Sequence, residues 1–142
     1  DSEKMKTHKD SEKTVKVIAG KFNSTEGPVN KHNVHPLYFD VVLNKHKIFD
    51  FNLPETHNSF IYLINGEIKV GEKKHEKITD SKLVLLTKGS KLKVESLIKS
   101  NFLLISGKPI GEKIARGGPF VMNTKAEILE AINDYHNGTF VK

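Results

Sequence analysis

The seven histidines are the side chains best suited to chemistry in this sequence of 142 residues, because cysteine is absent. His32 and His35 lie three residues apart beside Pro36, and His57 precedes an apolar run. Imidazole binds divalent transition metals, so these three residues are candidate ligands if their loops meet. Known metal spacings lie on regular elements, however, whereas His32 and His35 fall in a predicted loop. We therefore interpret all three as loop side chains exposed to solvent.

Other catalytic arrangements have weaker support in the sequence. The absence of cysteine excludes a disulfide framework, a thiolate zinc site and a cysteine nucleophile. There is no G-x-S-x-G elbow, phosphate-binding loop or dinucleotide fingerprint. Ser59 lies two residues after His57, which puts them on the same side of a strand, but no third member of a triad is identifiable. We attribute this pairing to chance.

The charge of the chain is basic without indicating a nucleic-acid partner. The net charge is +6, but Arg116 is the only arginine, and lysines alternate with glutamates in segments such as 72–77. Such mixed segments are typical of a solvated surface, whereas arginine is the usual reader of phosphate and guanine. No apolar run is long enough to span a membrane, and the first residues are hydrophilic. We expect a soluble, cytoplasmic protein without specific nucleic-acid binding or membrane contact.

The order of apolar runs predicts an all-β domain. Residues 1–14 are polar and are predicted to be a tail or an inter-domain linker, and the domain is expected over 15–142. Phe39, Val41 and Leu43 alternate with more polar residues, as do Phe49, Phe51 and Leu53, so each strand should bury one face. The predicted strands are Val15–Ala19, Leu37–Leu43, Ile48–Leu53, Ser59–Ile64, Glu67–Val70, Lys82–Thr87, Leu92–Val94 and Phe102–Ser106.

Two local signals define the connections between elements. Asn65-Gly66 lies between two predicted strands and favours a type I′ hairpin turn. Thr124 and Glu127 form a capping box, and Gly138 is a stop signal, so one helix is predicted over 125–136. Its apolar face should contain Ile128, Leu129, Ile132 and Tyr135, and we expect this face to cover one end of the barrel.

The final third of the sequence resembles the end of pirin-family proteins. The resemblance rests on residues 107–112, on Gly118-Pro119-Phe120-Val121-Met122-Asn123-Thr124, and on the capped helix that follows. Residues 15–20 and 27–29 are similar to the start of the second half of these proteins, and residues 60–67 to its centre. Pirin-like proteins contain two cupin domains in tandem. The resemblance therefore implies the second one, a jelly-roll-like antiparallel β-barrel of the cupin type with one C-terminal α-helix.

The resemblance also implies where a metal would bind. In the family, a His-x-His pair and a His-x-Glu pair in the first cupin domain hold iron or another divalent metal. Alignment on the segment before Gly66 places the corresponding positions here at Asn52 and Pro54, and at Val94 and Ser96. None of these side chains is a ligand of the required kind, and a slip to Glu95 would supply one carboxylate only. We expect no metal or other cofactor in this chain, and a cavity lined by Asn52, Pro54 and Val94.

Two functions of different classes follow from this resemblance. The first is a cupin domain without catalysis of its own, with a structural or protein-interaction role. The second is a part of a pirin-type quercetin 2,3-dioxygenase whose metal lies on an N-terminal cupin domain. The expected partners are that domain, a second copy of this chain in a homodimer, or another protein.

Overall fold

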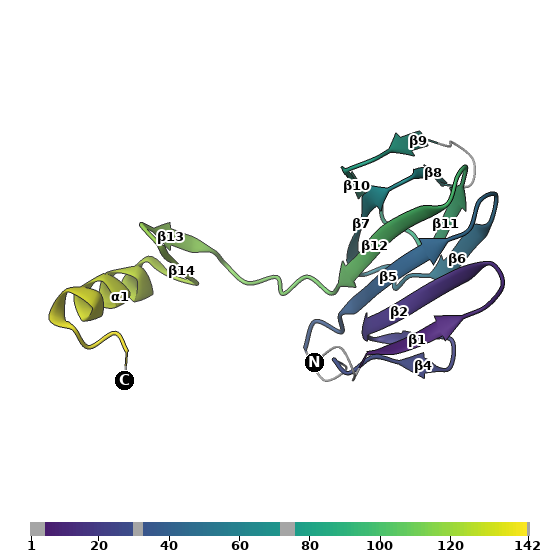
Figure 1. Cartoon of the computed structure of the whole chain (residues 1–142). Helices are drawn as coiled ribbons and strands as arrows, with labels where there is room; N and C mark the ends of the chain where they lie inside the picture. The colour runs from purple at the N-terminus through teal and green to yellow at the C-terminus, as the bar shows by residue number, and fades with distance from the viewer. Residues whose placement is uncertain (1–4, 30–32, 72–75, 142) are drawn as a thin grey trace. The chain divides into compact units, whose positions relative to one another are not determined.

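The computed structural model describes residues 5–29, 33–71 and 76–141 (Figure 1). Contacts divide the chain into two compact units, Asp1–Pro109 and Ile110–Lys142. The sequence predicted one domain over 15–142 after a polar segment, so both the division after Pro109 and the inclusion of the first residues are additional findings.

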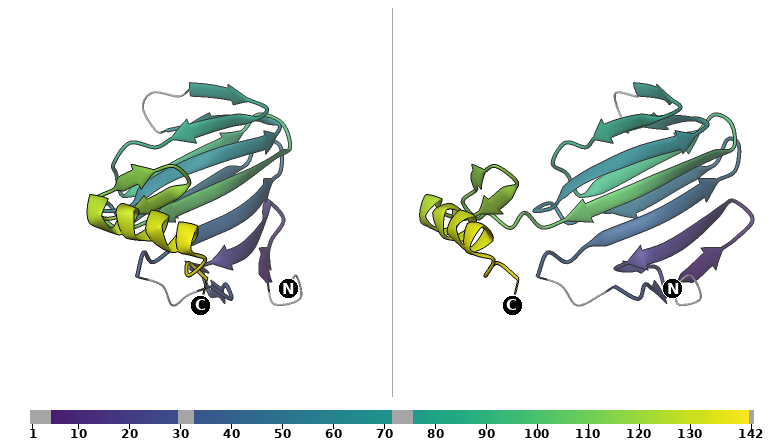
Figure 2. Two further views of the ribbon diagram at one scale, coloured as in Figure 1. Left: turned by 90° about the vertical axis from the view of Figure 1, so that its left-hand side faces the viewer. Right: turned by 60° about the vertical axis from the view of Figure 1, so that its left-hand side comes forward.

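The first unit consists of two antiparallel sheets (Figure 2). One sheet has six strands in the order β1-β2-β5-β12-β7-β10, and the other has four in the order β6-β11-β8-β9. A short pair, β3-β4, completes the unit. The strands are β1 (Lys6–Lys9), β2 (Lys13–Ala19), β3 (Lys21–Phe22), β4 (Thr25–Glu26), β5 (Leu37–Leu43), β6 (Ile48–Asn52), β7 (Asn58–Asn65), β8 (Glu67–Val70), β9 (Glu76–Thr79), β10 (Lys82–Leu85), β11 (Lys91–Ser96) and β12 (Ser100–Gly107).

The core lies between the two sheets and follows the period of two that the sequence shows. Phe39, Val41 and Leu43 on β5 are fully buried, and so are Ile61 and Leu63 on β7. Each such side chain stabilises the fold by about 1.5–3 kcal/mol relative to an exposed position. This confirms the predicted all-β cupin architecture, with the barrel present as a two-sheet sandwich.

The predicted hairpin at Asn65-Gly66 is wrong. β7 pairs with β12 and β10, whereas β8 pairs with β11 and β9, so the chain crosses between sheets at this point. Gly66 has φ +104°, and a Cβ there would lie 2.6 Å from the Cα of Ser100. The glycine is therefore required by a close approach to β12 rather than by a type I′ turn.

Strand β1 was not indicated by the sequence, since its residues are polar. It pairs with β2, and Asp10 forms the turn between them. The Asp10 carboxylate accepts hydrogen bonds from the backbone N–H groups of Glu12 (2.7 Å) and Lys13 (2.9 Å). These bonds lower the pKa of Asp10. An edge strand of this kind depends on its partner strand, so a search for apolar periodicity does not find it.

The second unit contains β13 (Ala115–Gly117), β14 (Phe120–Met122) and the helix α1 (Lys125–Asn137). The capping box of Thr124 and Glu127 is present, and Gly138 adopts the left-handed conformation at the helix end, as predicted. Ile128 is buried on the helix as predicted, joined by Ala131, while Leu129 and Tyr135 are exposed, which corrects the predicted apolar face. Among the residues that the structure describes, no helix is both long enough and apolar enough to cross a membrane.

Candidate functional site

Aromatic rings fill the interior of the first unit, where the sequence predicted a cavity. Phe49 stacks on Phe22 and meets Phe102 edge-on, both with centroids 5.6 Å apart. Phe51 meets Phe39 edge-on at 5.1 Å. Phe49, Phe39 and Phe102 are fully buried. Rings in such arrangements contribute packing beyond their buried area, so this region is a well-packed core.

The four predicted metal-ligand positions do not come together. Asn52 and Pro54 are exposed, whereas Val94 and Ser96 are buried. Asn52 pairs with Lys91 across the β6–β11 ladder and Val94 pairs with Phe49, so Asn52 and Val94 lie on opposite faces of one sheet. The expected lining by Asn52, Pro54 and Val94 is therefore not seen. The interior positions of this segment are occupied by Phe49, Phe51 and Leu53.

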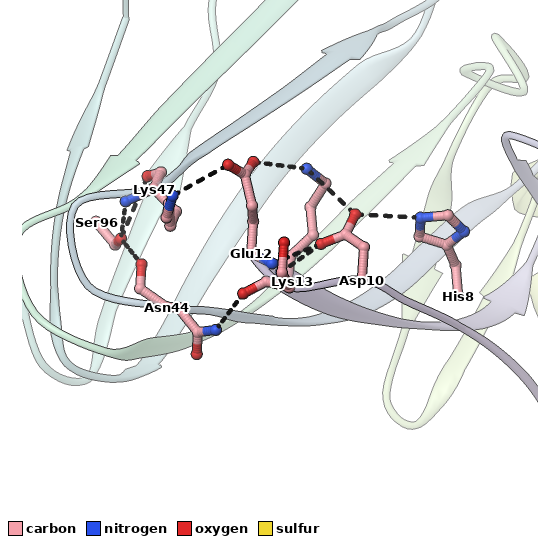
Figure 3. A network of polar contacts seen from close by, with 8 residues as sticks. His8, Asp10, Glu12, Lys13, Asn44, Lys47 and Ser96 are labelled. Atoms are coloured by element: carbon pink, nitrogen blue, oxygen red, sulfur yellow. Dashed lines mark hydrogen bonds and ion pairs between the residues drawn. The ribbon is translucent and has the colours of Figure 1, made fainter.

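Ser96 has a structural role at the end of β11 (Figure 3). Its hydroxyl hydrogen-bonds to the carbonyl of Asn44 and accepts from the backbone N–H of Lys47 at 3.2 Å. The ammonium of Lys47 forms an ion pair with Glu12 at 3.1 Å. Ser96 therefore anchors the turn between β5 and β6, and its hydroxyl is engaged there rather than toward a ligand.

One end of the same interior is polar. His57 and Ser106 are buried, and their Nδ1 and Oγ atoms lie 3.0 Å apart. Ser59 donates a hydrogen bond to Ser106 at 2.8 Å. In the tautomer of neutral His57 that carries its proton on Nε2, Nδ1 accepts a hydrogen bond from the Ser106 hydroxyl. This chain of three groups satisfies buried polar atoms in the way that interiors require.

The surroundings of His57 favour its neutral form. Burial lowers its pKa, and the nearby positive charges of His35, Lys88 and Lys108 act in the same direction. Lys88 donates to the carbonyl of His57 (2.9 Å) and to the side chain of Asn58 (2.9 Å), which fixes the loop before β7.

The surroundings of His57 also bear on the candidate metal site formed by His32, His35 and His57. His35 is near enough to His57 for its charge to act on the ring, while His32 lies outside the described residues. In the described parts of the chain, no three histidine, aspartate or glutamate side chains converge in a metal-binding arrangement. The residues that face the interior thus do not fit the imidazole and carboxylate set that an iron-type ion requires.

The sequence carries a signal that Ser106 is buried, although Ser106 is not among the predicted site residues. It ends the apolar run that begins at Phe102, two residues after Leu104, so alternation places its side chain on the buried face. A polar residue at a buried position requires partners, and those partners are His57 and Ser59. His57 and Ser59 are therefore joined through Ser106 in one hydrogen-bonded group.

An open pocket of about 310 Å³ lies beside the core, between strands of both sheets. Leu53, Val84 and Leu92 contribute apolar surface to it, and Glu76 and Lys91 contribute charge. None of the four predicted ligand positions lines this pocket. Its side chains offer shape and apolar contact rather than a set of metal ligands.

Two apposed antiparallel sheets around an apolar core give the first unit the architecture of a cupin β-sandwich. A family model described as the pirin C-terminal cupin domain matches residues 38–141, and the chain belongs to this family.

Similar proteins agree with this assignment. A pirin-like protein of Caulobacter vibrioides is 34% identical over 128 residues, covering 89% of this chain and 45% of that protein. Human pirin is 35% identical over 127 residues, covering 87% of this chain and 43% of pirin. A crystal structure named quercetin 2,3-dioxygenase, from Acinetobacter baumannii, matches with a TM-score of 0.84 at 27% identity, covering 99% of this chain and 49% of that one. The chain spans about half the length of the relatives it matches.

Proposed function

We propose that this chain is a metal-free cupin domain of a pirin-like protein, with a structural or protein-interaction role and no catalysis of its own. The observation that carries the proposal is the occupation of the interior by Phe49, Phe51 and Leu53. These apolar side chains fill the interior positions next to Asn52 and Pro54, where a family metal site would have its ligands. The packing of these side chains supports the proposal, because they bring no metal-ligand atoms to the interior positions that they occupy.

The physical argument concerns what a bound metal requires. A divalent transition metal needs several neutral imidazoles and a carboxylate that converge and are deprotonated. Burial lowers the pKa of His57 and so favours a neutral ring, but its Nδ1 lies 3.0 Å from the Ser106 hydroxyl. The side chains of Val94 and Ser96 are buried in the core and at a turn, respectively. Supplying a metal site would therefore require replacing core residues, which costs folding stability.

A second candidate function is supported by the match to a structure named quercetin 2,3-dioxygenase. In this alternative, the chain is one part of a pirin-type dioxygenase, and iron or another divalent metal is bound by an N-terminal cupin domain. The domain described here would then contribute rigidity or an interface to the active part. The two candidates agree about this chain and differ about the polypeptide that accompanies it.

Elemental analysis of the purified chain, after incubation with iron, copper or manganese and dialysis, tests the first proposal. We expect far less than one metal ion per chain and no oxygen uptake with quercetin. Retention of about one metal ion per chain together with oxygen uptake would overturn it. If metal alone were retained, variants with alanine at His32, His35 and His57 would identify the ligands. Quercetin-dependent oxygen uptake by a longer polypeptide that includes this chain, with metal outside it, would establish the second candidate.

A further inference from the structure

A charged side chain shares the inner face of the four-stranded sheet with residues of the core. On β9, Glu76 pairs with Val70 of β8, and Val70 pairs with Val94 of β11. Cross-strand partners lie on the same face of a sheet, and Val94 is fully buried in the core. Ile78, two residues after Glu76 on the same strand, is buried as well. The register therefore places Glu76 on the face that borders the space between the two sheets.

Glu76 lines the open pocket of about 310 Å³ beside the core, and it is exposed to solvent there. The apolar wall of this pocket includes Leu53 and Leu92, which are buried, and Val84, which packs against the core but is only partly buried. All of its described lining residues belong to the first unit. The volume lies at the lower end of the roughly 300–1,000 Å³ of ligand pockets, so the pocket suits a small molecule.

The carboxylate of Glu76 is available to a ligand. Its neighbour in sequence, Lys77, forms an ion pair with Glu67 at 3.0 Å. Among the described residues, none forms an ion pair or a hydrogen bond with the Glu76 carboxylate. A negative charge at the edge of an apolar pocket thus lacks a counter-ion within the described parts of the chain.

Two lysines also border the pocket, but they belong to the other face of the sheet. Lys91 and Lys93 flank Leu92 on β11, and Leu92 is buried, so alternation places both lysines on the outer face. There Lys93 pairs with Asp50 of β6, which provides a neighbour of opposite charge. Of these three charged lining residues, only Glu76 adds its charge on the side of the apolar wall.

We infer that this pocket binds a small molecule in which an apolar body carries a protonated amine. The apolar body is buried against Leu53, Val84 and Leu92, and this burial supplies most of the affinity. The ammonium group pairs with the carboxylate of Glu76, which selects a cation over a neutral or anionic molecule of the same shape. This binding site goes beyond the structural or interaction role proposed above and does not depend on it.

Titration with three molecules that share one apolar body, followed by nuclear magnetic resonance, tests the preference for a cation. 2-Phenylethylamine is positively charged at neutral pH, 2-phenylethanol is neutral, and phenylacetate is negatively charged. We expect the amine to bind about two- to fivefold more tightly than the alcohol, as an exposed ion pair allows, and the acid to bind more weakly than both. The methyl signals of Leu53, Val84 and Leu92 should shift, which locates the bound molecule. At 0.15 M salt, charges farther than about 8 Å are largely screened, so the net charge of +6 contributes little.

The variant Glu76→Gln keeps the shape of the side chain and removes its charge. We expect the amine and the alcohol to bind this variant equally, with the affinity for the alcohol unchanged. Because Glu76 is exposed, the fold is expected to remain intact, and circular dichroism checks this. The matched control is Glu95→Gln, which removes a carboxylate from the outer face of β11, where Glu95 pairs with Lys69. This control should keep the preference for the amine.

Several results would overturn the inference. They are tighter binding of the alcohol or the acid than of the amine, a preference for the amine that survives Glu76→Gln, equal loss of that preference in the control, and shifts confined to residues outside the pocket. Absence of binding by all three molecules would overturn it as well, and would indicate that another part of the chain fills the pocket. None of these results bears on metal content, which is measured separately.

Discussion

The middle of the sandwich interior and one of its ends differ in what holds them together. Strand β12 runs through both regions. Phe102 and Leu104 are fully buried in its middle, and the buried hydroxyls of Ser100 and Ser106 lie on either side of them along the strand. The aromatic middle is stabilised by the packing of rings against one another, which leaves no room for a ligand between them. The polar end is stabilised by hydrogen bonds among His57, Ser59 and Ser106, each of which needs its partner. The buried polar groups at this end therefore satisfy one another's hydrogen bonds within the fold.

The largest effect is expected from the aromatic middle. Phe49→Ala removes a fully buried ring that contacts Phe22 and Phe102, and it leaves a cavity. We expect it to lower the free energy of unfolding by about 3–5 kcal/mol, measured by chemical denaturation. The control Leu85→Ala truncates a side chain that is 75% exposed, and it should change stability by no more than about 0.5 kcal/mol under monomeric conditions. Equal effects of the two changes would contradict a packed interior.

A smaller effect is expected at the polar end. Ser106→Ala removes the hydroxyl that pairs with both His57 and Ser59, so buried polar atoms lose a partner. The expected loss is about 1–3 kcal/mol in the same measurement. Ser90→Ala, at an exposed position, is the matched control and should be nearly neutral. If Ser106→Ala were also neutral, these hydrogen bonds would not stabilise the fold.

The smallest effect concerns pH. Burial, followed by the charges of His35, Lys88 and Lys108, lowers the pKa of His57 below its usual value of 6.5. The unfolded chain therefore binds a proton more readily, and the stability contributed by neutral His57 is full above pH 6.5 and decreases as pH falls toward the folded pKa. We expect His57→Gln to reduce the loss of stability between about pH 7 and pH 5. Denaturation curves with identical pH dependence for the two proteins would show that His57 is not responsible.

Much of the fold could be predicted from the sequence because its strands follow simple alternation. Phe39, Val41 and Leu43 were placed correctly, and the helix with its Thr124 cap was confirmed. The polar strand β1 could not be predicted, since it is stabilised by pairing rather than by its own pattern. The path after Asn65 was also missed, because a turn signal does not say which strands will pair.

The candidate site was harder to predict than the fold, because successive side chains of a strand point to opposite faces of the sheet. Alternation of Phe49, Phe51 and Leu53 already indicated the inner face of β6, whereas the alignment selected Asn52 and Pro54. A shift of one residue moves a side chain to the other face of a sheet, so an alignment error of that size exchanges interior for surface. His57 and Ser106 are 49 residues apart, and only the pairing of β7 with β12 brings them together.

Thermal unfolding with and without a divalent metal tests the central claim that this interior is a core rather than a metal site. A ligand at about 100 times its Kd stabilises the folded state by about 2.7 kcal/mol. For a chain of this size, that corresponds to an increase in Tm of roughly 5–10 °C. We predict no saturable increase with iron(II), manganese(II) or nickel(II), and no decrease on adding a chelator. An increase of that size which saturates near one metal ion per chain, and which a chelator reverses, would contradict the account.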